Sequence, residues 1–396
     1  MRQNDAFIVS AVRTPIGKFI GALASKKATE LGSHVIAEAL ERAGAPAEHI
    51  DEVYFGNVVS AGLGQAPARQ AALGAGVPAS IPCTTINKVC GSGLKSIMLA
   101  AQAIRAGDGD LFVAGGMESM TNAPYLVTKA RTGYRLGHGE LLDSNISDGL
   151  WCATENEHMG MLAEFIANKH EIDRQSQDEW ALISHQRAVE ANANGSFQEE
   201  IAPVTIRDRR GNETIVADDE GPRPNSSIEA LGRLRPAFTK NGTVTAGNAP
   251  GLSDGAAAVI VASSHAVDRF GLKPIARIKS YANAATEPKL IFEAPVLAMR
   301  RLIEKQGADL GSYDLIEVNE AFAAQFLANG RALGFDFDRV NVHGGAVALG
   351  HPVGATGARM VVTLINALRT RDREQGVASL CLGGGGAVAM SLERTS

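Results

Sequence analysis

The chain has 396 residues, a formal net charge of -5 and 45% hydrophobic residues. A length near 400 allows two or three domains with a large buried core. The charge is mild and mixed along the chain, so we expect no nucleic-acid partner, which a basic stripe would indicate, and no disordered acidic tail.

The start of the chain, MRQNDAFIVSAVRTP, lacks the charged region, apolar core and cleavage site of a secretory signal. No stretch approaches the roughly 20 apolar residues that a membrane span needs. We therefore expect a soluble, cytoplasmic protein with no membrane partner. The four cysteines, Cys83, Cys90, Cys152 and Cys381, form no CxxC pair, so neither a zinc site nor a structural disulfide is expected.

Strands and helices alternate in the first 116 residues. The apolar spacing of residues 30–44 predicts a helix that ends at Gly44. The other predicted elements are strands over residues 6–14, 49–59 and 110–116 and a helix over residues 92–106. This alternation is typical of an α/β fold with a parallel type of sheet.

Residues from about 120 to 245 differ in composition from the rest of the chain. Polar and turn residues are frequent there, and residues 221–227 (GPRPNSS) are rich in proline. We expect a long insertion or a subdomain in this region.

The alternating pattern returns near Pro274 and resembles that of the first half. Helices are predicted over residues 296–307, 320–334 and 354–368, and strands over residues 314–319, 339–345, 376–384 and 386–394. Each half contains a strand, a Gly-rich turn, a helix and an apolar strand that runs into glycines. This similarity in plan indicates an internal duplication.

The segment NKVCGSG, residues 87–93, contains the first candidate catalytic residue, Cys90. It is predicted at a strand-to-helix turn, where the helix dipole would stabilise a thiolate and lower the thiol pKa. The glycines that follow would let a thioester approach the backbone and leave N–H groups free to bind an oxyanion. A packed cysteine at a tight turn explains the local sequence equally well.

Two Gly-rich segments of the second half contain further candidates. His351, in GHPVGATG, lies on a predicted turn and has the ordinary pKa of a general base. A lone histidine there would be a capping or surface residue, but a nucleophilic cysteine needs an adjacent base. Cys381, in CLGGGGA, ends a predicted strand and could shuttle a proton, or could pack as a buried strand residue.

The segment NEAFA, residues 319–323, follows the apolar strand DLIEV. The Asn319 side chain could donate a hydrogen bond to a carbonyl group, directly or through a water molecule. Capping of the next helix by Asn319 is the alternative, and it requires no catalysis.

Five segments in this order, NKVCGSG, GGMESM, NEAFA, GGAVALGHPVGATG and CLGGGGA, resemble the motif set of the thiolase family. The resemblance extends from about Phe7 to Glu393, and five motifs are far more specific than one Gly-rich match. It implies an α/β fold, a five-layered αβαβα sandwich of two similar halves. The N-terminal half would span residues 1–266 and include a loop domain at about residues 120–250. The C-terminal half would span residues 273–396.

The activity that the resemblance implies is that of an acetyl-CoA C-acetyltransferase. Such an enzyme joins two acetyl-CoA molecules into acetoacetyl-CoA plus CoA, reversibly, through an acyl-Cys90 intermediate. The alternative is a 3-ketoacyl-CoA thiolase of β-oxidation that acts on longer chains. CoA thioesters are the substrates, and no metal or other cofactor is expected.

The resemblance also implies a role for each candidate. Cys90 would be the acylated nucleophile, His351 would activate it, and Cys381 would exchange the α-proton of the second acyl-CoA. Asn319 would hold a water molecule in a first oxyanion hole together with His351. The backbone amides of Cys90 and Gly383 would form a second oxyanion hole.

The remaining implied contacts are with the acyl-CoA substrate: His158, Arg223, Ala246, Gly247, Pro250, Ile291 and Ala321. Three positions depart from the family pattern. Pro250 stands where many members have serine, Ile291 near where short-chain members often have methionine, and His343 where many have asparagine. These departures concern acyl-chain preference and not the type of reaction.

Residues 125–150 resemble the segment that builds tetramers in the family, so a homotetramer, a dimer of dimers, is implied. Two other classes of protein fit the sequence less well. A decarboxylating enzyme of the ketosynthase type would have histidine in place of Cys381. A catalytically silent acyl-CoA-binding relative would lack Cys90 or His351, and both are present.

Overall fold

The computed structural model describes residues 5–395; the remaining residues of the predicted halves, 1–4 and 396, lie outside the described residues. Most described strands belong to one large mixed sheet. From edge to edge its order is β14 (Leu315–Val318), β15 (Gln375–Leu382), β16 (Gly386–Arg394), β13 (Ala276–Ala285), β1 (Ala6–Arg13), β12 (Ser253–Ser263), β5 (Leu111–Ser119), β3 (Glu52–Gly56) and β4 (Cys83–Ile86), with β2 (Gly17–Lys18) paired to β12.

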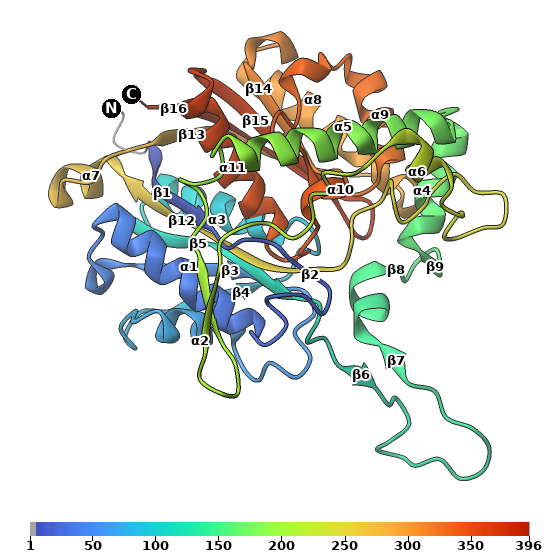
Figure 1. Cartoon of the computed structure of the whole chain (residues 1–396). Helices are drawn as coiled ribbons and strands as arrows, with labels where there is room; N and C mark the ends of the chain where they lie inside the picture. Colours follow the sequence, from blue (N-terminus) through green and yellow to red (C-terminus); the bar gives the residue numbers. More distant parts are fainter. Residues whose placement is uncertain (1–4, 396) are drawn as a thin grey trace.

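Helices lie in three layers around the two halves of this sheet (Figure 1). The outer layer of the first half contains α1 (Ala28–Ala43), α2 (Pro67–Gly74) and α7 (Ser264–Phe270). The central layer contains α3 (Ser92–Ala106) and α11 (Thr356–Thr370). The outer layer of the second half contains α8 (Ala294–Gln306) and α9 (Ala323–Leu333).

Strand β5 shows why the sequence forms these layers. All of its residues are buried, and successive side chains of a strand point to opposite faces. Phe112 and Ala114 pack with the central helices, whereas Leu111 and Val113 pack with the outer helices. The five-layered αβαβα arrangement implied by the family resemblance is therefore confirmed.

The two halves share one strand order, except that the first half has one more strand, β4, at its outer edge. The first half runs β4-β3-β5-β12-β1, the second runs β14-β15-β16-β13, and β1 and β13 join them through two residue pairs. Both β1 and β13 carry a bulge near their start, between Ile8 and Ser10 and between Ile278 and Ser280. The two halves are therefore similar in plan, as predicted, and their first strands also share the position of a β-bulge. Their predicted boundary at residues 266–273 overlaps α7 and stays a prediction.

One local prediction holds only in part, and another is wrong. β3 pairs parallel with β4 and β5, as the alternation predicts, but β12 pairs antiparallel with β5, and β16 with β15. The short turn after β15 can join only antiparallel strands. No strand forms at residues 339–345, where Val340 makes one isolated bridge to Ile316. The positive φ values of Asn341 and Gly344, 47° and 79°, turn the chain away from an extended path.

The inserted region after β5 is built from short elements and two longer helices. They are β6 (Tyr125–Leu126), β7 (Leu142–Asp143), η2 (Asn145–Leu150), β8 (Trp151–Cys152), β9 (Glu157–His158), α4 (Met159–Lys169), α5 (Arg174–Ala193), β10 (Val204–Arg207), β11 (Glu213–Val216) and α6 (Ile228–Gly232). The β6–β7 hairpin projects away from the body of the protein (Figure 1).

Short helical turns complete the connections: η1 (Ala47–His49), η3 (Pro288–Glu293), η4 (Leu310–Ser312), η5 (Phe337–Arg339) and α10 (Ala346–Leu349). Within residues 5–395, no helix has both the length and the apolar character needed to cross a membrane.

Candidate active site

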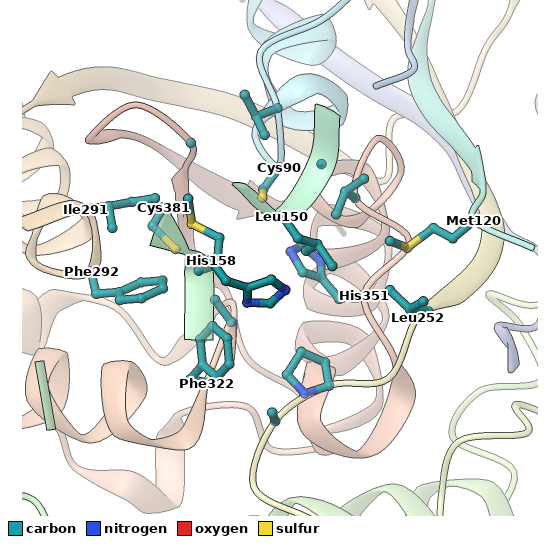
Figure 2. A pocket seen from close by; sticks show the side chains of 18 of the residues that line it. Cys90, Met120, Leu150, His158, Leu252, Ile291, Phe292, Phe322, His351 and Cys381 are labelled. Carbon is teal, nitrogen blue, oxygen red and sulfur yellow. The ribbon is translucent and has the colours of Figure 1, made fainter. Parts of the chain in front are cut away.

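A cavity of about 190 Å³ lies beyond the carboxyl ends of the parallel strands of both halves. Ends of parallel strands are a common place for ligand sites in α/β proteins. Eight predicted site residues line this cavity, and Figure 2 shows several of their side chains pointing into it. The eight are Cys90, His158, Pro250, Ile291, Ala321, His351, Cys381 and Gly383.

The turn before Cys90 is strained and is supported by side chains. Val89 has a φ of 47°, which for a β-branched residue is a genuine outlier, at a cost of about 1–3 kcal/mol. Asn87 Oδ1 accepts a hydrogen bond from the Val89 amide at 3.1 Å. Ser92 Oγ accepts from the Lys88 amide at 2.8 Å and donates to the Val89 carbonyl at 2.6 Å. This turn fixes Cys90 at the start of α3.

The prediction that the Cys90 thiol has a lowered pKa is wrong. Enclosure in the apolar cavity raises the pKa of Cys90 to about 11, because burial disfavours the thiolate. The backbone amides of Cys90 and Gly383 act in the opposite direction but do not outweigh burial, and the carboxylate of Glu118 raises the pKa further. Cys90 is therefore a neutral thiol at neutral pH.

Hydrogen bonds at His351 determine which ring nitrogen carries the proton. The Thr356 hydroxyl donates its one hydrogen to the Pro352 carbonyl at 2.9 Å, so at the His351 Nδ1 contact of 2.7 Å it must accept. His351 Nδ1 is therefore protonated. Nε2 keeps its lone pair and accepts a long hydrogen bond, 3.4 Å, from Asn319 Nδ2.

His351 has the geometry of a base but not its ordinary pKa. Burial, together with the positive charge of Arg359, lowers the pKa of His351 to about 3. The imidazole is therefore neutral at neutral pH, like the Cys90 thiol. Proton transfer between them must be coupled to attack on a bound thioester, since neither group is ionised in the free protein.

Cys381 extends the reactive part of the cavity. It lies near the end of β15, is 2% exposed, and its sulfur faces the same space as that of Cys90 (Figure 2). Burial and the nearby Cys90 thiol raise the pKa of Cys381 well above its ordinary value. The Gly383 and Cys90 amides both reach the Cys90 sulfur, as expected if they form the second oxyanion hole.

Aromatic side chains form one continuous wall of the cavity. His158 stacks on Phe238 at 4.9 Å between ring centroids. Phe238 contacts the edge of Phe322 at 6.3 Å, and Phe322 contacts Phe292 at 5.5 Å. Ile291 and Phe292 are 2% and 1% exposed. These rings therefore form a packed, largely apolar part of the cavity lining.

Four predicted residues do not line the cavity. Asn319 lies behind it, 1% exposed, and reaches it through the hydrogen bond to His351. Arg223 is exposed, and its amide donates to His185 Nδ1 at 3.2 Å. Ala246 is exposed, and Gly247 is buried beside Leu231 and Leu234. The predicted CoA contacts of Arg223, Ala246 and Gly247 stay predictions.

Several residues that shape the cavity were not found from the sequence. Thr356 orients His351, and its position five residues after the histidine, at the start of α11, was a signal that could have been used. The aromatic wall comes from four separate segments, so only the three-dimensional structure assembles it. The rest of the lining consists of Val89, Met120, Gly149, Leu150, Met159, Ala249, Gly251, Leu252 and Val353.

A cysteine and a histidine that share one cavity at the strand ends of an α/β fold are typical of an enzyme that forms covalent intermediates. The thiolase N-terminal domain family matches residues 6–265, and the thiolase C-terminal domain family matches residues 272–394. The chain therefore belongs to the thiolase family.

Full-length relatives extend this result. An acetyl-CoA acetyltransferase of Escherichia coli K12 is 54% identical over 392 residues, 99% of each chain. Acetyl-CoA acetyltransferase 2 of Arabidopsis thaliana is 48% identical, over 98% of this chain and 97% of the relative. The crystal structure of the Bacillus anthracis acetyl-CoA acetyltransferase superposes with a TM-score of 0.97 at 43% identity, over 99% of each chain.

Proposed function

We propose that this protein is an acetyl-CoA C-acetyltransferase, which converts two acetyl-CoA molecules into acetoacetyl-CoA and CoA in a reversible reaction. The observation that carries the proposal is the convergence of Cys90, His351 and Cys381 on one small cavity. These residues come from both halves of the chain, and nothing in core packing requires two thiols and an imidazole to share one space.

In the first half reaction, the Cys90 sulfur attacks the carbonyl carbon of acetyl-CoA. His351 Nε2, whose lone pair accepts only the long hydrogen bond from Asn319, takes the thiol proton and returns it to the departing CoA sulfur. The negative charge that develops on the carbonyl oxygen is stabilised by the amides of Cys90 and Gly383. The products are acetyl-Cys90 and CoA.

In the second half reaction, His351 Nε2 takes the proton of the Cys381 thiol, and the Cys381 thiolate then removes a proton from the α-carbon of a second acetyl-CoA. The resulting carbanion attacks the carbonyl carbon of acetyl-Cys90 and a carbon–carbon bond forms. The Cys90–acyl bond breaks, and the departing Cys90 sulfur takes the proton from His351. Asn319 and His351 would stabilise the enolate oxygen of the second acetyl-CoA, with a water molecule between them. The sequence of two half reactions predicts ping-pong kinetics.

The small cavity favours short acyl groups over those of a longer-chain 3-ketoacyl-CoA thiolase. Phe292 and Phe322 line the same cavity as Cys90 and Cys381, and their rings contact each other at 5.5 Å. A longer chain would have to displace these rings, which are packed against each other and 1% and 9% exposed. The similar proteins of Escherichia coli and Bacillus anthracis carry the name acetyl-CoA acetyltransferase, which supports the same choice.

Three further parts of the proposal concern binding and assembly. Arg223, Ala246 and Gly247 would contact the CoA portion, and the reaction would use no metal or cofactor besides CoA thioesters. The exposed apolar side chains of the β6–β7 hairpin would pack against other copies in a homotetramer. These are Tyr125, Val127, Tyr134, Leu136, Leu141 and Leu142. A cytoplasmic location and a role in fatty acid metabolism stay predictions from the sequence.

The test is CoA-dependent cleavage of acetoacetyl-CoA by the wild type and by Cys90→Ser and Cys381→Ser variants. We expect turnover in the wild type and a loss of at least about 1,000-fold in both variants, as for other essential catalytic groups. Incubation of Cys381→Ser with labelled acetyl-CoA should still label Cys90. A wild type without turnover would overturn the proposed activity, and full activity of Cys90→Ser would overturn the nucleophile.

A further inference from the structure

Glu118 is a buried carboxylate that touches no part of the cavity, yet it connects two loops that form it. Glu118 lies next to the last residue of β5 and is 0% exposed. Its Oε1 accepts hydrogen bonds from Asn57 Nδ2 at 2.9 Å and the Val59 amide at 3.2 Å. Its Oε2 accepts from the amides of Val58 and Gly354, both at 3.0 Å.

One of these contacts leads to the turn of the nucleophile. The Val58 carbonyl accepts a hydrogen bond from Asn87 Nδ2 at 3.3 Å, and Asn87 Oδ1 holds the strained Val89 amide. Val58 also packs in the apolar cluster that touches Val89 and Cys90. Glu118 is thus connected to Cys90 through three consecutive contacts.

The other contact leads to the loop of the base. Gly354 lies three residues after His351, between Val353, which lines the cavity, and Thr356, which orients the imidazole. The space around Gly354 is closed: a methyl group there would lie 2.7 Å from both Glu118 Oε2 and the Met117 carbonyl oxygen. The loop therefore has little freedom to move relative to Glu118.

The chemistry of the four contacts requires a carboxylate. Every partner is an N–H donor, and each oxygen accepts two of them. A glutamine would point its NH₂ group at two donors in either orientation, and an aspartate would be one methylene too short to reach both loops. Burial and Asp254 raise the pKa of Glu118 to about 7, against the effect of the amides.

We propose that Glu118 is a positioning residue, which sets the distance between the Cys90 turn and the His351 loop and places a negative charge behind the thiol. The proposal rests on the proposed function for its effect on turnover. The effect of Glu118 on the pKa of the Cys90 thiol does not depend on turnover, because the carboxylate repels the thiolate and so raises that pKa. The two effects are measured separately.

The experiment compares the full-length wild type with Glu118→Gln and Glu118→Asp. Turnover of acetoacetyl-CoA gives kcat and KM, and the pH profile of Cys90 alkylation by iodoacetamide, read by peptide mass, gives the thiol pKa. The other titratable side chains that line the cavity, His158, His351 and Cys381, are unchanged in both variants.

In both variants we expect kcat to fall about 10- to 100-fold, as for a misplacement near 1 Å, with KM within about threefold of the wild-type value. Glu118→Gln removes the charge, so its alkylation midpoint should move down by about half a pH unit or more. Glu118→Asp retains the charge, so its midpoint should stay within a few tenths of a unit of the wild type.

Glu200→Gln is the matched control. Glu200 is also buried, but it binds Arg13 and Thr363, and it does not line the cavity. The Glu200→Gln variant should have a lower unfolding temperature, and the pH midpoint of its Cys90 alkylation should equal that of the wild type. The proposal is overturned if folded Glu118→Gln keeps the wild-type midpoint, or if Glu118→Asp keeps wild-type kcat. If the wild type does not cleave acetoacetyl-CoA, the proposed function is overturned. The alkylation measurement still tests the effect of Glu118 on the Cys90 thiol.

Discussion

The Thr356 hydroxyl lies 2.7 Å from Nδ1 of His351 and donates its own hydrogen to the Pro352 carbonyl. This relationship directs the lone pair of Nε2 toward the cavity. Thr356→Val keeps the shape of the side chain and removes the hydroxyl oxygen that accepts the hydrogen bond from His351 Nδ1. We expect kcat for acetoacetyl-CoA cleavage to fall about tenfold or more with little change in KM, because a buried N–H is left unpaired and the tautomer is no longer fixed.

Thr363→Val serves as the control for this change, since Thr363 is buried on the same helix and hydrogen-bonds Glu200 outside the cavity. It should lower stability and leave kcat within about twofold of the wild type. Equal losses of kcat in the two variants would contradict the role of Thr356.

The Cys90 thiol should ionise at unusually high pH in the free protein. Because enclosure raises the pKa of Cys90 to about 11, its rate of alkylation by iodoacetamide should rise with pH to a midpoint near that value. In urea the midpoint should return to the ordinary value of 9.0. A midpoint below 9 in the folded protein would mean that the helix dipole and the amides outweigh burial.

Phe292 should limit the acyl chain. Phe292→Ala removes one ring from the aromatic wall, so we expect the ratio of kcat/KM for 3-ketohexanoyl-CoA to that for acetoacetyl-CoA to rise about tenfold or more. Stability should fall by about 3–5 kcal/mol, as for other buried phenylalanines. Measured rates with the two substrates, together with urea unfolding, test both expectations.

Phe326→Ala is the matched control for Phe292→Ala. Phe326 is 0% exposed and stacks on Trp180 at 4.2 Å, outside the cavity. This variant should lose similar stability with an unchanged ratio of the two rates. A Phe292→Ala variant with the wild-type ratio would assign the length limit to other residues.

His343 should make the protein less stable in acid. Burial, with Arg371 and Arg13 nearby, lowers the pKa of His343 from 6.5 to about 4. Below pH 6.5 the unfolded chain binds a proton at this residue before the folded protein does, so stability is lost as the pH falls from 6.5 toward 4. At pH 5 the loss from this group is about 2 kcal/mol.

His343→Asn removes this titration, and unfolding in urea at pH 7.5 and pH 5 measures it. The free-energy loss between the two pH values should be smaller in the variant than in the wild type. His265→Asn, at a residue whose side chain is 62% exposed, should behave as the wild type. The same acid loss in His343→Asn as in the wild type would rule out this contribution.

The β6–β7 hairpin should carry contacts between copies of the chain. Leu136 is 101% exposed, and exposed apolar clusters of this kind mark interaction sites. Leu136→Glu should shift the mass measured by light scattering from a tetramer to a smaller assembly. Ile215→Glu, at another exposed apolar residue on β11 (69% exposed), should leave the mass unchanged. A tetramer in Leu136→Glu would overturn the role of the hairpin.

The sequence alone determined the elements, the family and the chemically reactive residues. Helix α3 was predicted with its observed bounds, and α1 ends at Gly44 as expected, because apolar periodicity and glycine conformation are local properties. The motifs around Cys90, His351 and Cys381 were recognisable because, in their order along the chain, they resemble those of the thiolase family. What the sequence could not supply was their environment.

Only the tertiary structure decided how these residues behave. The sequence predicted a lowered pKa for Cys90 from its helix, but enclosure by residues from both halves raises it, and burial is not a local property. The tautomer of His351 depends on Thr356, and the placement of two loops depends on Glu118. The acyl-chain limit depends on rings brought together from four segments, which no short-range pattern in the sequence connects.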